Sequence, residues 1–263
     1  MSAFSTPLLD LFRRGDVDRE LRLLAARGAL ATRGQEQVGL LMLMVGDGDP
    51  EVAATAEQTL QAIPNDKLAR FLARSDVPAD VRAFFAARSV EPAESPDTEE
   101  ADAPLSGEPE DITASAPEAA AEGEPEDEQT TVQRIAAMSV AQRVVTAMKG
   151  TREERAILIR DSNKLVNAAV LSSPKLTETE VERIAKMTSV SEEVLRIIGR
   201  TRAWMKNYSI AAGLARNSKT PITMSMNILS RLTAKDLKAI TTDRNVPDVV
   251  RQSAKRKLTP GNE

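Results

Sequence analysis

Three short stretches of the chain share one pattern and determine the expected fold: DVPADV at residues 76–81, SVSEEV at residues 189–194 and NVPDVV at residues 245–250. Each runs from a polar residue through Val and then Pro or Ser to at least one acidic residue and a final Val. Pro and Ser are favoured where a helix begins, and an acidic side chain is stabilised near the positive end of the helix dipole. The pattern therefore predicts a buried Val, a helix start and a second Val that faces the core. DPEV at residues 49–52 is a looser fourth copy.

The sequence around these stretches predicts further short amphipathic helices. Residues 37–45 are nearly all apolar and predict a central helix with Leu41 in the core, and Leu60 lies on the apolar face of the helix that DPEV begins. TREE at residues 151–154 and TETE at residues 177–180 are capping boxes, in which Thr and Glu each accept the other's backbone N–H. Helices of roughly 8–13 residues with loops of about 2–5 are typical of stacked helical hairpins, so we expect an all-α protein built from helical repeats.

The composition restricts the chemistry that is available. The chain has no Cys and no His, which excludes disulfides, zinc–thiolate sites and every Ser-His or Cys-His arrangement. Catalysis by other residues becomes a minority interpretation, so we expect a non-enzymatic protein without a cofactor or metal. The longest apolar run, residues 38–45, is far shorter than the ~20 residues of a membrane-spanning helix, and the first fifteen residues do not resemble a signal peptide. A cytoplasmic protein with no membrane partner is the expectation.

The charge is divided unequally along the chain. Residues 89–132 hold fifteen acidic residues and no Lys or Arg, residues 1–88 are almost neutral, and residues 133–263 carry twenty-four basic and twelve acidic residues. The middle segment is also rich in Pro, Ala, Ser and Thr and has only isolated large apolar residues, so it cannot offset the loss of chain entropy on folding. We therefore predict two helical-repeat domains, residues 1–88 and a basic domain of residues 133–263, joined by a disordered acidic linker of residues 89–132.

The chain resembles the bacterial HEAT-like and variant leucine-rich α-helical repeat proteins. The resemblance rests on DPEVAATAEQTL (49–60), SDVPADV (75–81), SSPKLTETEV (172–181) and RNVPDVV (244–250). It implies a fold that usually presents binding surfaces, and it implies no particular chemistry. The segment RTRAWMKNYSIAAGLARNSKTP (200–221) is similar to one found in uncharacterised bacterial proteins and identifies no activity.

One candidate surface surrounds the only Trp and the only Tyr. Trp204 and Tyr208 are four residues apart, which predicts one helical face, and Arg200, Arg202 and Lys206 lie close to them in the sequence. Such a patch could bind a partner or stack on a base. The simpler interpretation is that both rings fill the junction between two repeats, with the cations over them or in water.

A second candidate surface is the basic end of the last predicted helix, which carries Arg251, Lys255, Arg256 and Lys257. It could bind phosphates or acidic side chains, or it could complement the dipole at the end of a helix. By contrast, GDGD at residues 46–49 lacks the later carboxylates of a calcium loop, and Pro50 makes it a helix start.

These observations favour a scaffold or adaptor that binds protein partners through helical-repeat surfaces. The alternative is a nucleic-acid-binding protein that uses the basic second domain, with the acidic linker as an internal competitor. Because any strongly basic region binds polyanions weakly, weak nucleic-acid binding is expected under either hypothesis.

Overall fold

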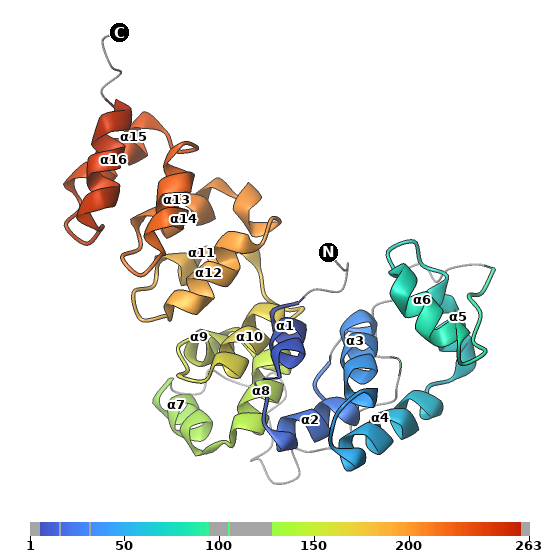
Figure 1. The fold of residues 1–263 in the computed structure, drawn as a ribbon. Helices are drawn as coiled ribbons and strands as arrows, with labels where there is room; N and C mark the ends of the chain where they lie inside the picture. Colours follow the sequence, from blue (N-terminus) through green and yellow to red (C-terminus); the bar gives the residue numbers. More distant parts are fainter. Residues whose placement is uncertain (1–5, 16, 32, 95–104, 106–127, 259–263) are drawn as a thin grey trace. The chain divides into compact units, whose positions relative to one another are not determined.

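The structure, a computed structural model, describes residues 6–15, 17–31, 33–94, 105 and 128–258. Every regular element in these residues is a helix, which confirms the all-α prediction (Figure 1). The elements are α1 (Pro7–Arg14), α2 (Arg19–Ala26), α3 (Gly34–Val45), α4 (Pro50–Ala62), α5 (Asn65–Leu72), α6 (Ala79–Ala86), α7 (Glu128–Ala137), α8 (Val140–Lys149), α9 (Arg152–Leu158), α10 (Lys164–Ser172), α11 (Glu178–Lys186), α12 (Glu192–Arg200), the 3-10 helix η2 (Trp204–Lys206), α13 (Tyr208–Arg216), α14 (Ile222–Leu229), α15 (Ala234–Thr242) and α16 (Asp248–Leu258).

The chain divides into two compact units, and each is described by itself. Unit 1 comprises residues 1–158 and 168–175, and unit 2 comprises residues 159–167 and 176–263. This division differs from the predicted one, because residues 133–158 belong with the N-terminal helices. Within unit 1, α2 packs against α8, and the backbone N–H of Leu8 donates to the Ser172 hydroxyl at 3.2 Å. Contacts between segments so distant in the chain leave no local signal in the sequence.

The predicted linker, residues 89–132, lies mostly outside the described residues. Where it is described, two features differ from the prediction. Helix α7 begins at Glu128, ahead of the predicted end of the linker. Leu105, predicted to be an isolated residue in a disordered segment, is 6% exposed. Its burial depends on a partner far away in the sequence, which composition alone cannot reveal.

Capping residues explain where the helices begin, as the sequence predicts. Thr6 caps α1 by accepting the N–H of Leu9 at 3.3 Å, and Ser139 and Thr177 form capping boxes at α8 and α11. At α9, Glu154 accepts the N–H of Thr151 at 2.6 Å and also the Arg134 guanidinium at 2.8 Å. The Glu154 carboxylate therefore accepts hydrogen bonds both from the backbone at the start of α9 and from an arginine of α7. Glu154 is only 5% exposed.

Four helical hairpins of the described chain share one spacing: α5–α6, α11–α12, α13–α14 and α15–α16. The second helix always begins fifteen residues after the residue that caps the first, which is Pro64, Thr177, Asn207 or Thr233. Thirteen residues after the cap, a buried side chain precedes the second helix: Val77, Val190, Thr220 and Val246, which are 3%, 0%, 3% and 2% exposed. The predicted role of the three Val residues is confirmed, and Thr220-Pro221 is a further copy with Thr in place of Val.

The core of each unit is mostly aliphatic, and in unit 1 Phe12, Phe71 and Phe85 are buried as well. In unit 1, Leu41 is fully buried and Leu60 is 6% exposed, which confirms their predicted places on apolar faces. In unit 2, α11 packs against α13, and α14 packs against α16. We call the side of unit 2 that carries α11, α13 and α15 the surface of the first helices, and the side that carries α12, α14 and α16 the surface of the second helices.

Candidate partner-binding surface

Trp204 and Tyr208 do not share a helix, and the prediction of one helical face is wrong. Helix α12 ends at Arg200, Trp204 begins the 3-10 helix η2, and Tyr208 is the first residue of α13. Asn207 is the reason, because it caps α13. Its side chain accepts the N–H of Ser209 at 2.9 Å, and its backbone is extended (φ −75°, ψ 120°). Asn is one of the favoured capping residues, so this signal was present in the sequence.

Tyr208 connects two hairpins. Its hydroxyl donates to the Asp236 carboxylate and accepts the backbone N–H of Thr233 at 3.0 Å, at the start of α15. The Tyr208 hydroxyl, followed by that of Thr233, holds the pKa of Asp236 below its usual range, because both donate to the ionised carboxylate. The ring is still 41% exposed. The Tyr208 hydroxyl thus joins α13 to the start of α15, while the residue itself stays largely exposed.

The surface of the second helices holds a pocket lined by three arginines. It lies between α12, η2 and α14 and has a volume of about 370 Å³. Its charged lining residues are Arg196, Arg200 and Arg231, and no carboxylate of the described residues lines it. Thr223 and Asn227, one turn apart on α14, add side chains that can donate hydrogen bonds.

The three arginines differ in how far they are already engaged. Arg196 pairs with Glu193 at 2.6 Å and with Glu192, and Arg231 donates to the backbone carbonyl of Met205 at 2.6 Å. Arg200 is exposed and has no ion pair among the described residues. Arg200 is therefore the cation best placed to receive a ligand's negative group, and it was one of the predicted site residues.

Exposed apolar side chains occur on the same set of helices. Ile222 and Met226, one turn apart on α14, are 45% and 39% exposed, and Val249 on α16 is 50% exposed. Because α14 packs against α16, these three residues lie on adjacent helices. Protein-binding surfaces are marked by adjoining exposed apolar side chains, whereas single scattered ones are ordinary. Hydropathy alone does not identify them, since Ile222 and Met226 belong to a helix that also has buried apolar residues.

The other predicted cations occupy different places. Arg202 and Lys206 are exposed in and around η2. Arg251 forms an ion pair at 2.9 Å with Asp248 of its own helix, whereas Lys255, Arg256 and Lys257 are exposed in the last turns of α16. Arg256 and Lys257 therefore face water at the negative end of the helix dipole, where cations are stabilised.

The surface of the first helices carries a larger and electrically mixed groove. Its volume is about 590 Å³, and it is lined by Lys186 and Arg216 together with Asp236 and Asp243. Asn217 lies beneath it, 4% exposed, and donates to the carbonyls of Ala185 and Met187 at 2.9 and 2.8 Å. With equal numbers of positive and negative side chains and a buried Asn that serves the fold, this groove carries no strong preference for a charged ligand.

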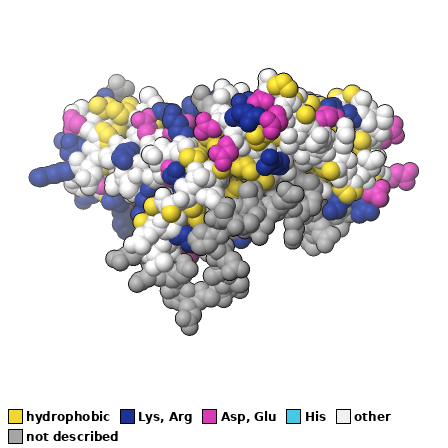
Figure 2. All heavy atoms as spheres, turned by 90° about the horizontal axis from the view of Figure 1, so that it is seen from below, with side chains coloured by type: hydrophobic (Ala, Val, Ile, Leu, Met, Phe, Trp, Pro, Cys, Tyr) yellow, Lys and Arg dark blue, Asp and Glu magenta, His cyan; other side chains and the backbone are white. Residues whose placement is uncertain are grey.

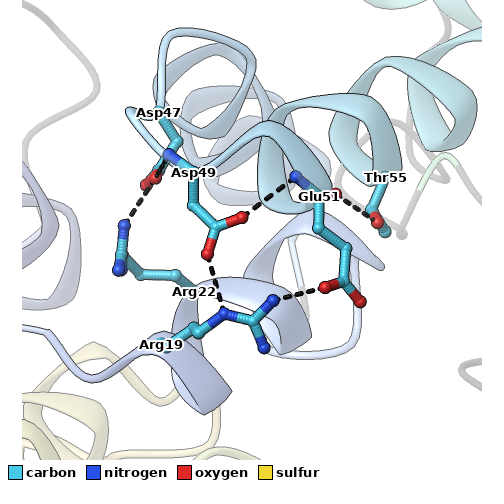
Figure 3. A network of polar contacts seen from close by, with 6 residues as sticks. All are labelled: Arg19, Arg22, Asp47, Asp49, Glu51 and Thr55. Carbon is cyan, nitrogen blue, oxygen red and sulfur yellow. Dashed lines mark hydrogen bonds and ion pairs between the residues drawn. The ribbon is translucent and has the colours of Figure 1, made fainter.

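In unit 1 the aspartates of the loop between α3 and α4 form ion pairs with arginines (Figure 3). Asp49 caps α4 by accepting the N–H of Glu51 at 3.0 Å and pairs with Arg19 at 2.7 Å, while Asp47 pairs with Arg22. The bond from Arg19, and next the N–H of Glu51, lowers the pKa of Asp49. The loop is a helix start, as predicted. Among the described residues, no three His, Cys, Asp or Glu side chains are grouped so that they could hold a metal ion.

Charge is mixed over much of the surface. On the face shown in Figure 2, Lys and Arg side chains are interspersed with Asp and Glu side chains and with apolar ones. Within the described part of the chain, no helix is long and apolar enough to cross a membrane.

Comparisons with known proteins identify no family for this chain. It matches no family model, and neither the curated proteins nor the solved structures include one that is significantly similar to it.

Proposed function

We propose that the chain is a non-enzymatic scaffold or adaptor, and that the second-helix surface of unit 2 binds a segment of a protein partner. The observation that carries this proposal is the pocket lined by Arg196, Arg200 and Arg231 without a carboxylate. A pocket with that lining favours a ligand that brings its own negative charge.

The exposed apolar side chains of α14 and α16 indicate a second feature of the ligand, an apolar group. Ile222, Met226 and Val249 would gain from burial against another apolar group, which a phosphodiester backbone does not provide. A peptide segment with acidic residues beside a large aliphatic or aromatic residue has both features. This combination favours a protein partner over a nucleic acid, although cations in the last turns of α16 extend the basic surface.

Selection from a random peptide library on the full chain tests the proposal. We expect enrichment of sequences that combine acidic residues with a large apolar residue. The affinity of a selected peptide, measured by calorimetry at about 150 mM salt, should fall about tenfold in Arg200→Glu, because the favourable charge pair becomes a repulsive one. Met226→Asp should weaken it as well. Lys238→Glu, an equal change of charge at an exposed position of α15, is the matched control and should bind normally.

Two results would contradict the proposal. One is selected peptides without acidic residues, or peptides whose affinity Arg200→Glu leaves unchanged. The other is tight binding of a DNA or RNA duplex that persists at about 150 mM salt and depends on its sequence or structure, which would favour the nucleic-acid alternative. Weak binding that disappears with salt is expected of any basic surface and does not distinguish the two.

A further inference from the structure

A buried polar side chain in unit 1 is the starting point. Gln37 lies on α3 among buried Val38, Leu40 and Leu41, and it is only 1% exposed. A carboxamide in such surroundings destabilises the fold unless its donor and acceptor are both satisfied. A Leu or Met would fill the position without that requirement, so the partners of Gln37 show what the side chain is there to do.

Gln37 bonds to backbone groups in two different parts of the chain. The Gln37 amide donates to the carbonyl of Gly28 at 3.4 Å, directly after α2. Gly28 has a φ of +74°, which glycine adopts without strain. The Gln37 oxygen accepts the N–H of Leu105 at 2.7 Å, a bond across 68 residues of sequence. The shorter bond is therefore the one to the distant segment.

Leu105 is distinctive within its own segment. From residue 91 to residue 131 the only large apolar residues are Leu105 and Ile112, and the neighbouring side chains include Asp102, Glu108 and Glu110. Leu105 is 6% exposed, so both its side chain and its backbone N–H are removed from water. A backbone hydrogen bond together with one buried anchor side chain is how short linear motifs are commonly recognised.

We propose that the Gln37 site of unit 1 is a peptide-docking site, and that Leu105 of the chain's own acidic segment is its occupant. Gln37 recognises the backbone of the docked residue, and the apolar surroundings recognise the leucine side chain. The occupant is held on the same chain at an effective concentration near millimolar, which disfavours a second peptide of the same chemistry. This site lies in unit 1 and does not depend on the function proposed for unit 2.

The experiment uses the full chain and a synthetic peptide of residues 99–111, EEADAPLSGEPED. In the native chain the site is already filled, so the peptide should bind weakly. Leu105→Asp removes the internal anchor, and we expect calorimetry to show at least about tenfold tighter binding of the peptide to this variant. Ile112→Asp is the matched control: it makes the same kind of change in the same segment and should bind the peptide as weakly as the native chain.

Gln37→Met tests recognition at the other side of the contact. It keeps the size of the side chain but removes the acceptor, so the double variant with Leu105→Asp should lose the gained affinity while circular dichroism stays helical. Amide exchange provides a readout that needs no variant of Gln37: the N–H of Leu105 should exchange at least about tenfold more slowly in the native chain than in a free peptide of residues 99–111.

The proposal is overturned if the Leu105→Asp chain binds the peptide no better than the native chain does. It is equally overturned if the Leu105 amide exchanges as fast in the native chain as in the free peptide. Tighter peptide binding to Ile112→Asp as well would show that general loss of the segment, and not the Leu105 anchor, opens the site.

Discussion

Replacing Thr220 by Val should stabilise unit 2, although most substitutions of buried residues destabilise a protein. Thr220 is 3% exposed, and its hydroxyl is buried with no hydrogen-bond partner among the described residues. The equivalent positions of the other three hairpins are occupied by Val77, Val190 and Val246. Val and Thr have nearly the same shape, so the change removes an unsatisfied hydroxyl and leaves the packing in place.

The magnitude follows from two contributions. A hydroxyl buried without a partner costs about 1–3 kcal/mol in proteins, and the methyl group that replaces it adds about 0.8 kcal/mol when buried. Part of this is lost where the neighbouring atoms must adjust to the methyl group. We therefore expect the free energy of unfolding of unit 2 to rise by about 1–2 kcal/mol, which corresponds to an increase in Tm of roughly 4–8 °C per kcal/mol for a unit of this size.

Urea and thermal unfolding of the full chain, followed by circular dichroism, measure the change, and amide exchange in α13 and α14 locates it. The reverse substitution in a sister hairpin, Val190→Thr, is the matched control and should destabilise by a similar amount. A Thr220→Val chain that is less stable than the native chain, or equally stable within about 0.3 kcal/mol, would refute the reasoning, because the hydroxyl would then have a partner such as a buried water.

Four further substitutions test other contacts. Asn217→Ala removes the amide that serves two backbone carbonyls at the end of α11 and should lower the free energy of unfolding by about 2–3 kcal/mol in urea unfolding. The lowered pKa of Asp236 stabilises the fold above the unfolded pKa near 4, and this contribution is lost as the pH falls through the folded pKa. Asp236→Asn and Tyr208→Phe should therefore each weaken the dependence of Tm on pH in acid. Glu154→Ala removes the carboxylate shared by Arg134 and the α9 cap and should cost about 3 kcal/mol in urea unfolding; a cost below about 0.5 kcal/mol would show that the pair is effectively solvated.

The helix starts could be predicted from the sequence because each depends on residues within a few positions. Thr177 and Glu180 satisfy each other's backbone groups whatever the rest of the chain does. The motif containing Val190 likewise carries its own cap and its own core residue. The sequence pattern does not identify Thr220 as a copy of that motif, because a Thr replaces the Val that defines it.

The candidate sites were less accessible to sequence reasoning. Arg200 was singled out, but Arg196 and Arg231 join it only when α12 packs beside α14. The bond from Leu105 to Gln37 spans 68 residues and involves a backbone N–H, which has no sequence signature at all. The four-residue spacing of Trp204 and Tyr208 predicts one helix, but Asn207 between them caps α13 and separates the two residues.

The chain's one Trp and one Tyr both belong to unit 2. Intrinsic ultraviolet emission therefore reports unit 2 alone, while all five Phe residues lie in unit 1 and emit only weakly. Trp204 is partly buried in η2, so its emission maximum should shift to longer wavelength when that hairpin opens to water. A single heating scan that records both emission and helical content thus separates the melting of the two units in the unmodified protein, with no label attached.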